Sequence, residues 1–176
     1  MRNNRPIVTC PEEEAYLAYI DEHCNNVLKA FIKDGDTILL NLGISKSRED
    51  LLFRVKAHDV SKYGDDEFEA YRNYFYPKEG EKKDRKAFDI AWKHHYTHNS
   101  HHWEFYLDED GNPKPMKLEA VAEMLLDWEA MSIKFGGNPY NWYQSNKDKI
   151  KLHPDTKFLV EHALQIIFKN WEWVNE

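Results

Sequence analysis

The sequence is poor in cysteine and in long apolar runs, and these two absences exclude several classes of protein. Its 176 residues include two cysteines, Cys10 and Cys24, too few and too far apart for a disulfide framework or a zinc knuckle. No stretch approaches the roughly 18 apolar residues that span a membrane. The opening MRNNRPIVTC also has no apolar core of a signal peptide. We therefore expect a cytoplasmic protein with no membrane partner.

The chain also lacks an excess of basic residues. It carries 24 Lys and Arg against 31 Asp and Glu, which gives a net charge of −7. Duplex nucleic acid is normally bound by a basic patch that releases counterions, so this charge argues against a duplex as the partner. A small phosphorylated ligand, such as a nucleotide, is compatible with it. The oligomeric state is not predicted by the sequence.

Apolar residues recur with a helical period along most of the chain, which indicates an all-α fold. Without internal repeats or low-complexity tracts, residues 1–176 are expected to form one domain, a bundle of about six helices. The longest irregular segment is residues 97–116. Helices are expected at residues 11–33, 47–59, 66–76, around 88–95, at 117–135 and at 154–172, the last packing on the others.

Glycine and capping residues predict where two of these helices begin and end. Gly35 is expected to end the first helix, because glycine is common just past a helix C-terminus. Ser47 and Asp50 resemble a capping box at the start of the second helix. We expect this second helix to continue through His58 and Asp59.

Ionisable side chains occupy the apolar faces of three expected helices. His23 lies on the apolar stripe of the first helix, and Asp127 lies among apolar residues of the helix at 117–135. His58 and Asp59 continue the apolar face of the second helix. Burying an uncompensated carboxylate costs several kcal/mol, and carboxylates and imidazoles compensate one another best around a divalent cation. A hydrogen-bonded polar cluster is the alternative. The side chains of adjacent helical residues point about 100° apart. His58 and Asp59 could therefore share one ion only if the ion lay against the edge of their helix.

The order His…His-Asp…Asp, formed by His23, His58-Asp59 and Asp127, resembles the HD-domain superfamily of metal-dependent phosphohydrolases. The resemblance covers about residues 16–135 and implies an all-helical HD-like domain in which these four side chains bind a divalent metal. The segments HDVSKYGDDEFEAYRNYFYP and AWKHHYTHNSHHWEFY are more closely similar to a bacterial and phage family of unknown function. That closer similarity supplies no activity.

The resemblance also implies a catalytic role for Lys62. The stretch HDVSK is close to a His-Asp-x-(Gly/Ala/Ser)-Lys form in phosphodiesterase branches of the superfamily, where the lysine faces the substrate phosphate. Asp59 and Lys62 are therefore the expected catalytic residues. A metal held by Asp59 would lower the pKa of its water toward about 7, and Lys62 would stabilise developing charge. A solvated lysine at a helix C-terminus is the alternative.

The implied activity is hydrolysis of a phosphate ester or anhydride, with a nucleotide as the expected substrate. The cofactor would be one or two divalent transition-metal ions, from Mn, Fe, Zn, Ni and Co. Two alternatives stay open: a non-catalytic, metal-stabilised interaction protein, and a di-iron oxygenase, since a histidine-rich version of the HD fold can activate oxygen. Lys62 favours phosphate chemistry, because it has no obvious purpose in a structural metal site.

Five of the nine histidines fall within residues 94–102. In the two-metal branches of the superfamily, extra histidines between the doublet and the last aspartate hold the second ion. General acid catalysis and simple surface exposure are alternatives, and His98 is expected to be exposed. The candidates for a second metal or for substrate contact are His94, His95, His101 and His102.

Glu67 and three tryptophans are further candidates for contact with a substrate. Glu67, in the acidic run after the doublet, could protonate a leaving group, although such a run more commonly begins a helix. The tryptophans lie near the expected site in the sequence and could stack a nucleobase, with core packing as the alternative. They are Trp92, Trp103 and Trp128.

Overall fold

The computed structural model describes residues 5–45 and 48–169. These residues contain no β-strand, only an isolated bridge between Leu107 and Pro113. The predicted all-α fold is therefore confirmed. The α-helices are α1 (Pro11–Asn41), α2 (Arg48–Ala57), α3 (Phe68–Phe75), α4 (Arg85–His98), α5 (Leu118–Phe135), α6 (Pro139–Asn146) and α7 (Pro154–Ala163). Shorter 3-10 turns form η1 (Val60–Tyr63), η2 (Trp103–Tyr106) and η3 (Lys147–Lys149), and η4 (Leu164–Phe168) is a π-helical turn.

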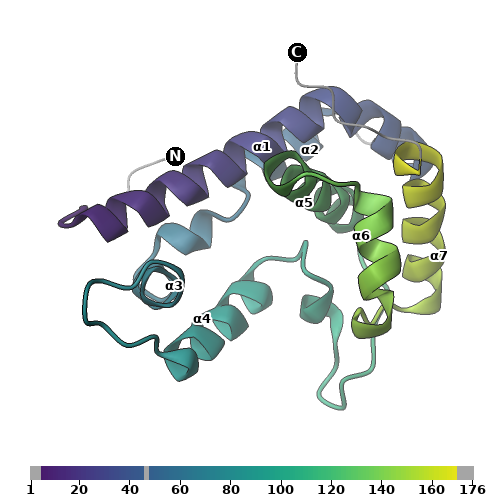
Figure 1. Ribbon diagram of the computed structural model, residues 1–176. Helices are drawn as coiled ribbons and strands as arrows, with labels where there is room; N and C mark the ends of the chain where they lie inside the picture. The colour runs from purple at the N-terminus through teal and green to yellow at the C-terminus, as the bar shows by residue number, and fades with distance from the viewer. Residues whose placement is uncertain (1–4, 46–47, 170–176) are drawn as a thin grey trace.

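Helix α1 crosses the whole molecule, and α2, α3, α5 and α7 pack along it (Figure 1). Its main partner is α5. Val27 and Ala30 on α1 are wholly buried, as are Val121 and Leu125 on α5, so the two helices remove apolar surface from water along their shared length. Although α1 has 31 residues, none of the described helices is both long and apolar enough to cross a membrane.

Two separate apolar clusters form the core. The larger cluster joins α1 to α2, α5 and α7 and includes Val27 and Leu125. The smaller cluster joins the first turns of α1 to α3 and α4 and includes Ile20 and Tyr71. His23 lies on α1 between Ile20 and Val27 and is also buried. His23, one of the predicted metal ligands, therefore lies on α1 between the two apolar clusters.

The expectation that Gly35 ends the first helix is wrong. Helix α1 continues to Asn41, and Gly35 is buried within it. A Cβ atom at this position would lie 2.9 Å from Cδ2 of Phe31, one helical turn earlier, so the glycine makes room for the aromatic ring. The chain turns instead at Gly43, whose φ of +66° is left-handed.

The expectation that the second helix continues through His58 and Asp59 is also wrong. Helix α2 ends at Ala57, and Asp59 has a φ of 56°, in the left-handed region. This conformation costs a non-glycine residue about 1–3 kcal/mol and is typical of functional sites. The proposed capping residue Ser47 lies outside the described residues.

Helix α6 is an addition to the six expected helices. Its N-terminus is capped by the side chain of Asn138, which accepts hydrogen bonds from two backbone N–H groups, and Pro139 occupies the first turn. The last helix begins at Pro154 as expected, and η4 extends it to Phe168. Its expected end at residue 172 lies outside the described residues.

A glutamate is buried between α1 and α5. The side chain of Glu129 is wholly buried, and neither of its oxygens has a hydrogen-bond partner within the described residues. The Nζ atom of Lys33 lies 3.5 Å from its Oε1. Burial, and then the neighbouring Asp34 carboxyl, raise the pKa of Glu129 to about 9. The folded protein therefore favours the protonated form of Glu129.

Glu129→Gln should make the free energy of unfolding less dependent on pH. The pKa of Glu129 is raised from its ordinary value of 4.5 to about 9 in the folded protein. The protonated carboxyl therefore stabilises the fold fully below pH 4.5, and this stability is lost as the pH rises toward about 9. Glutamine resembles the protonated form but does not titrate. We expect the variant to gain about 1–3 kcal/mol on the wild type between about pH 5 and about pH 8.

Urea unfolding of the two proteins at both pH values, in the presence of a chelator, measures this gain. Glu14→Gln is the matched control, because Glu14 is exposed on the same helix α1 that covers Glu129. A stability difference between Glu129→Gln and wild type that is the same at both pH values would contradict the raised pKa.

Candidate metal centre

The left-handed backbone at Asp59 brings the side chains of two sequence neighbours together. On a continuous helix the side chains of His58 and Asp59 would diverge by about 100°. Because α2 ends at Ala57 and the chain reverses at Asp59, His58 Nε2 lies 3.7 Å from Asp59 Oδ1. The break in the helix thus allows both side chains to reach one centre.

The four ligands predicted for the first metal meet at this point. His23 reaches it from α1 and Asp127 from α5. His23 Nε2 lies 3.2 Å from His58 Nε2 and 3.5 Å from Asp59 Oδ2. It also lies 3.1 Å from Asp127 Oδ1, and His58 Nε2 is 3.9 Å from the same oxygen. We call His23, His58, Asp59 and Asp127 the first ligand group.

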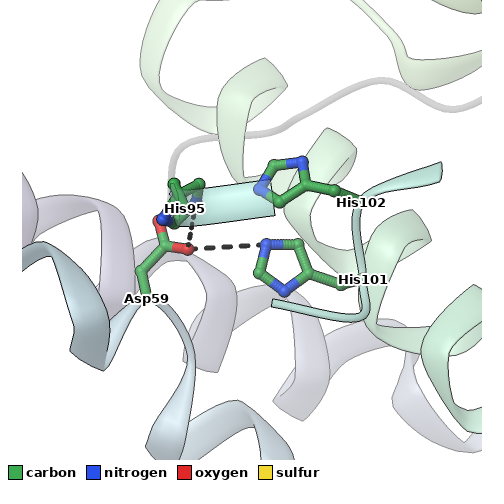
Figure 2. Close-up of side chains that lie close together, drawn as sticks. All are labelled: Asp59, His95, His101 and His102. Carbon is green, nitrogen blue, oxygen red and sulfur yellow. Dashed lines mark ion pairs between the residues drawn. The ribbon is translucent and has the colours of Figure 1, made fainter. Parts of the chain in front are cut away.

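Three histidines of the segment 95–102 gather around Asp59 Oδ1, the oxygen that His58 Nε2 also approaches. His95 Nε2 lies 3.3 Å and His101 Nε2 lies 3.4 Å from Asp59 Oδ1 (Figure 2). A ring nitrogen of His102 completes a set of four atoms that all lie within 4.8 Å of one another. We call Asp59, His95, His101 and His102 the second ligand group. Asp59 belongs to both groups, so its carboxylate could bridge two ions.

Within the described residues, the polar atoms that converge in the second ligand group have no hydrogen-bond partner. The unpartnered atoms are Asp59 Oδ1 and the Nε2 atoms of His95, His101 and His102, all of them buried. A buried polar group left unpaired costs about 1–3 kcal/mol, so four of them at one point need an explanation. Imidazole nitrogen and carboxylate oxygen are good ligands for divalent transition metals. His95 Nε2 and His101 Nε2 approach Asp59 Oδ1 only at ion-pair distances of 3.3 and 3.4 Å, and His102 Nε2 has no partner within the described residues, so this set of atoms fits a metal ion.

Asp59 is held in its ionised form although it is buried. Burial alone would raise its pKa, but Lys62 and the imidazoles of His58 and His95 outweigh this effect and hold the pKa of Asp59 well below its usual range. Lys62 Nζ donates to Asp59 Oδ2 at 2.6 Å. Burial would lower the pKa of Lys62, but Asp59 raises it. One oxygen of Asp59 thus pairs with Lys62, and the other faces the second ligand group.

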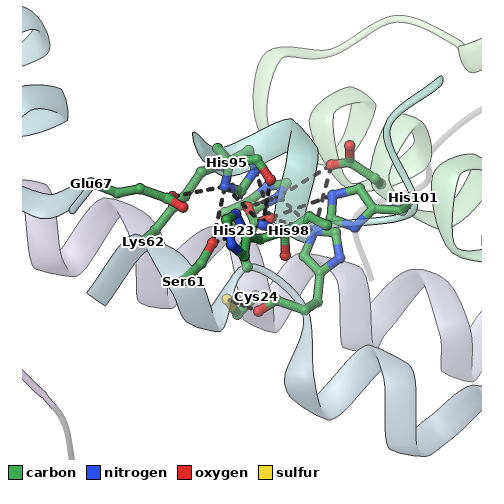
Figure 3. Close-up of polar contacts among 12 residues, drawn as sticks. His23, Cys24, Ser61, Lys62, Glu67, His95, His98 and His101 are labelled. Carbon is green, nitrogen blue, oxygen red and sulfur yellow. Dashed lines mark hydrogen bonds and ion pairs between the residues drawn. The ribbon is translucent and has the colours of Figure 1, made fainter. Parts of the chain in front are cut away.

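Carboxylates behind the histidines fix which ring nitrogen faces the centre. His58 Nδ1 donates to Glu123 Oε1 at 3.0 Å. His95 Nδ1 donates to Glu67 Oε2 at 2.8 Å (Figure 3). His101 Nδ1 lies 3.3 Å from the same oxygen of Glu123. An imidazole that donates from Nδ1 presents the lone pair of Nε2, and such carboxylate partners are typical of metal-ligating histidines.

Glu123 is the residue of this site that the sequence prediction missed. It is buried on α5, one helical turn before Asp127, so the two carboxylates share a face of the helix. This spacing of two acids on an apolar face was the available signal. Arg54 Nη2 lies 2.7 Å from Glu123 Oε2. Burial would raise the pKa of Glu123, but His101 and His58 hold it well below its usual range.

Glu67 lies behind His95 rather than in contact with a substrate-sized space. Its side chain is fully buried, and its two oxygens accept from His94 and His95, each at 2.8 Å. Burial would raise the pKa of Glu67, but these hydrogen bonds lower it, which does not suit the proton donor expected from the sequence. His94 contacts Glu67 and is not a member of either ligand group. His98 is exposed, as expected.

A cavity of about 390 Å³ opens beside both ligand groups. Asp59 and Lys62 form part of its wall, so a molecule in the cavity would contact the centre directly. The remaining wall is rich in aromatic rings. It includes the three tryptophans considered above, Trp92, Trp103 and Trp128, together with Trp142 of α6.

Comparison with known proteins places the chain among relatives without an assigned activity. The model of a family of unknown function, DUF5662, matches residues 12–166. This range contains every member of both ligand groups. No curated protein and no solved structure matches the chain. The likeness to the HD-domain superfamily therefore stays a resemblance of residues and spacing.

Glu123→Gln should weaken metal binding without removing a ligand. The amide group removes the negative charge that holds His58 and His101 by their Nδ1 atoms, and the loss of such a partner typically costs about 10–100-fold in metal affinity. Competition with a chromophoric chelator measures this affinity. Arg54→Met is the matched control, since it removes a cation from the same carboxylate but leaves both imidazole contacts. Equal losses in the two variants would contradict the orienting role.

Proposed function

We propose that this chain, which belongs to the DUF5662 family, is a metal-dependent hydrolase of a small phosphate ester or anhydride, with a nucleotide as its substrate class. One observation carries the proposal. Lys62 lines the cavity and contacts one oxygen of Asp59, while the other oxygen faces three imidazole nitrogens that have no hydrogen-bond partner in the described part of the chain. A cation site next to an ammonium group, both at the wall of a cavity, suits an anionic substrate oxygen.

Each ligand group would hold one divalent ion. The first ion would be bound by His23, His58, Asp59 and Asp127, and the second by Asp59, His95, His101 and His102. Nitrogen and oxygen ligands of this kind suit Mn, Fe, Co, Ni or Zn. The adjacent cavity argues against a purely structural metal, because structural sites are closed by protein ligands.

The proposed chemistry divides between the ions and the side chains. When bound, such ions polarise a phosphoryl oxygen and make hydroxide available near neutral pH. Lys62 would hold a phosphoryl oxygen and stabilise the charge that develops on it. Because Asp59 already fixes the Lys62 ammonium, little reorganisation is needed when the substrate arrives. Glu67 is assigned to positioning His95, and Glu123 to positioning His58 and His101.

A di-iron oxygenase is the second candidate, and one observation favours it. The second ligand group supplies three imidazoles and one carboxylate, a donor set that iron also accepts. The placement of Lys62 favours the hydrolase, because its ammonium group at the cavity wall can hold a phosphoryl oxygen.

The metal content of the protein should depend on Asp59 more than on any other ligand. Protein purified without a chelator should carry about two divalent ions per chain. Asp59→Ala should lose most of both, because Asp59 is shared by the two ligand groups, whereas His102→Ala should lose mainly one. Elemental analysis by mass spectrometry gives these contents. His98→Ala, at an exposed histidine outside both groups, is the control. Full metal content in Asp59→Ala would refute the shared-ligand arrangement.

Lys62→Ala should reduce turnover of the best phosphorylated substrate on the order of 10²–10³-fold, the usual cost of losing one preorganised charge contact. Its metal content should stay close to that of the wild type, because a protonated lysine has no lone pair to offer a metal. Lys56→Ala is the control, since Lys56 is exposed at the end of α2.

Two results would count against this role for Lys62. Loss of metal in Lys62→Ala would mean that the lysine supports the fold of the site. Unchanged turnover in that variant, or a metal-loaded wild type that hydrolyses none of a broad set of nucleotides and phosphodiesters, would remove the support for a phosphohydrolase.

A further inference from the structure

The cavity extends from the second ligand group to a wall of tryptophans. Trp92 begins this wall, because its ring centroid lies 5.0 Å from that of His102. Trp128 and Trp142 continue it, with ring centroids 5.1 Å apart. Trp142 is still 46% exposed, so this part of the wall is open to a ligand. The volume of about 390 Å³ falls in the range of pockets that hold whole small molecules rather than a phosphate group alone.

Glu104 supplies an unpaired acceptor at the same wall. It belongs to η2, directly after Trp103, and it is one of the residues that line the cavity. Its Oε2 atom is buried and has no hydrogen-bond partner among the described residues. Glu104 is a member of none of the candidate ligand groups for a metal ion. A buried acceptor of this kind is costly unless a ligand brings the donor.

We propose that the tryptophan wall binds a flat heteroaromatic ring that carries an exocyclic amino group, and that this amino group donates to Glu104 Oε2. The proposal rests on the proposed function, because it describes the part of the substrate that lies beyond the phosphate. It assigns Glu104 as a specificity-determining residue and names the substrate class as nucleotides of adenine, guanine or cytosine.

Two features of the wall favour an amino-bearing ring over other anionic ligands. Indole rings bind the faces of nucleobases by stacking, whichever base is present, so the tryptophans alone select a flat ring but not its substituents. The Glu104 carboxylate accepts hydrogen bonds but donates none when ionised, so it selects a donor on the edge of the ring. A sugar phosphate or inorganic phosphate would have no flat ring to lay against the tryptophans and would bring no ring amino group to Glu104 Oε2.

The test compares pairs of ligands that differ only in the amino group. The probes are nucleoside 5′-phosphonates, in which carbon replaces the scissile oxygen, so that binding to the metal-loaded full chain is measured without turnover. The pairs are adenine with purine, guanine with hypoxanthine, and cytosine with pyrimidin-2-one. Quenching of tryptophan fluorescence reports the dissociation constant of each. The wild type should bind at least one amino-bearing ring about tenfold or more tightly than its partner.

Glu104→Leu should abolish this preference, so that the members of each pair bind within about twofold of one another. Glu109→Leu is the matched control, because Glu109 is exposed in the same segment, and it should keep the wild-type preference. Equal binding within all three pairs by the wild type would overturn the proposal, whether or not the Glu104 variant folds. A preference that persists in a folded Glu104→Leu protein would also overturn it.

These outcomes are separable from a failure of the proposed function. If the amino-bearing probes bind as expected but their natural phosphates are not hydrolysed, the ring site stands and the hydrolase does not. If phosphates are hydrolysed without regard to the amino group and the probes bind equally, the hydrolase stands and the role of Glu104 is refuted.

Discussion

The buried carboxylate of Asp59 is the constraint on which the rest of the site depends. It lies in a left-handed backbone conformation at the end of α2, and its two oxygens face different partners. One oxygen accepts from Lys62 at 2.6 Å, and the other faces the Nε2 atoms of His95 and His101. On a continuous helix the side chains of His58 and Asp59 would diverge by about 100°, and the left-handed backbone at Asp59 brings them together. The local strain is therefore linked directly to the convergence of the ligands.

The balance of charge around Asp59 explains why the site suits a cation. Four buried or partly buried carboxylates surround the histidines, and the cationic side chains in contact with them are Lys62 and Arg54. Each of the three best-placed imidazoles uses Nδ1 to contact a carboxylate. Burial would lower the pKa of His101, but Asp59 and Glu123 raise it to about 10, so a metal bound by this imidazole would displace a proton. A divalent ion would bind the Nε2 atoms that have no partner within the described residues and would offset the negative charge of the carboxylates. The carboxylates are Asp59, Glu67, Glu123 and Asp127.

Helical periodicity was enough to predict the all-α fold and to bring His23 and Asp127 to the same interior, because burial follows the apolar stripe of each helix. The helix break at Asp59 could not be predicted in this way. The helical spacing of buried residues continues through His58 and Asp59, although the helical backbone ends at Ala57. Gly35 misled the prediction because its missing side chain accommodates Phe31 within the helix. Glu123 escaped because its partners are histidines distant in the sequence, which only the folded chain brings together.

Anomalous scattering from a crystal of protein purified without a chelator tests the central claim most directly. Two peaks are expected, one on each side of the Asp59 carboxylate and about 3.5–4 Å apart, as in other two-metal sites. The first should lie within about 2.0–2.2 Å of His23 Nε2 and Asp127 Oδ1, and the second within the same distance of His95 Nε2 and His101 Nε2. Ordered histidines with no peak between them, or a metal bound elsewhere on the chain, would contradict a centre built around Asp59.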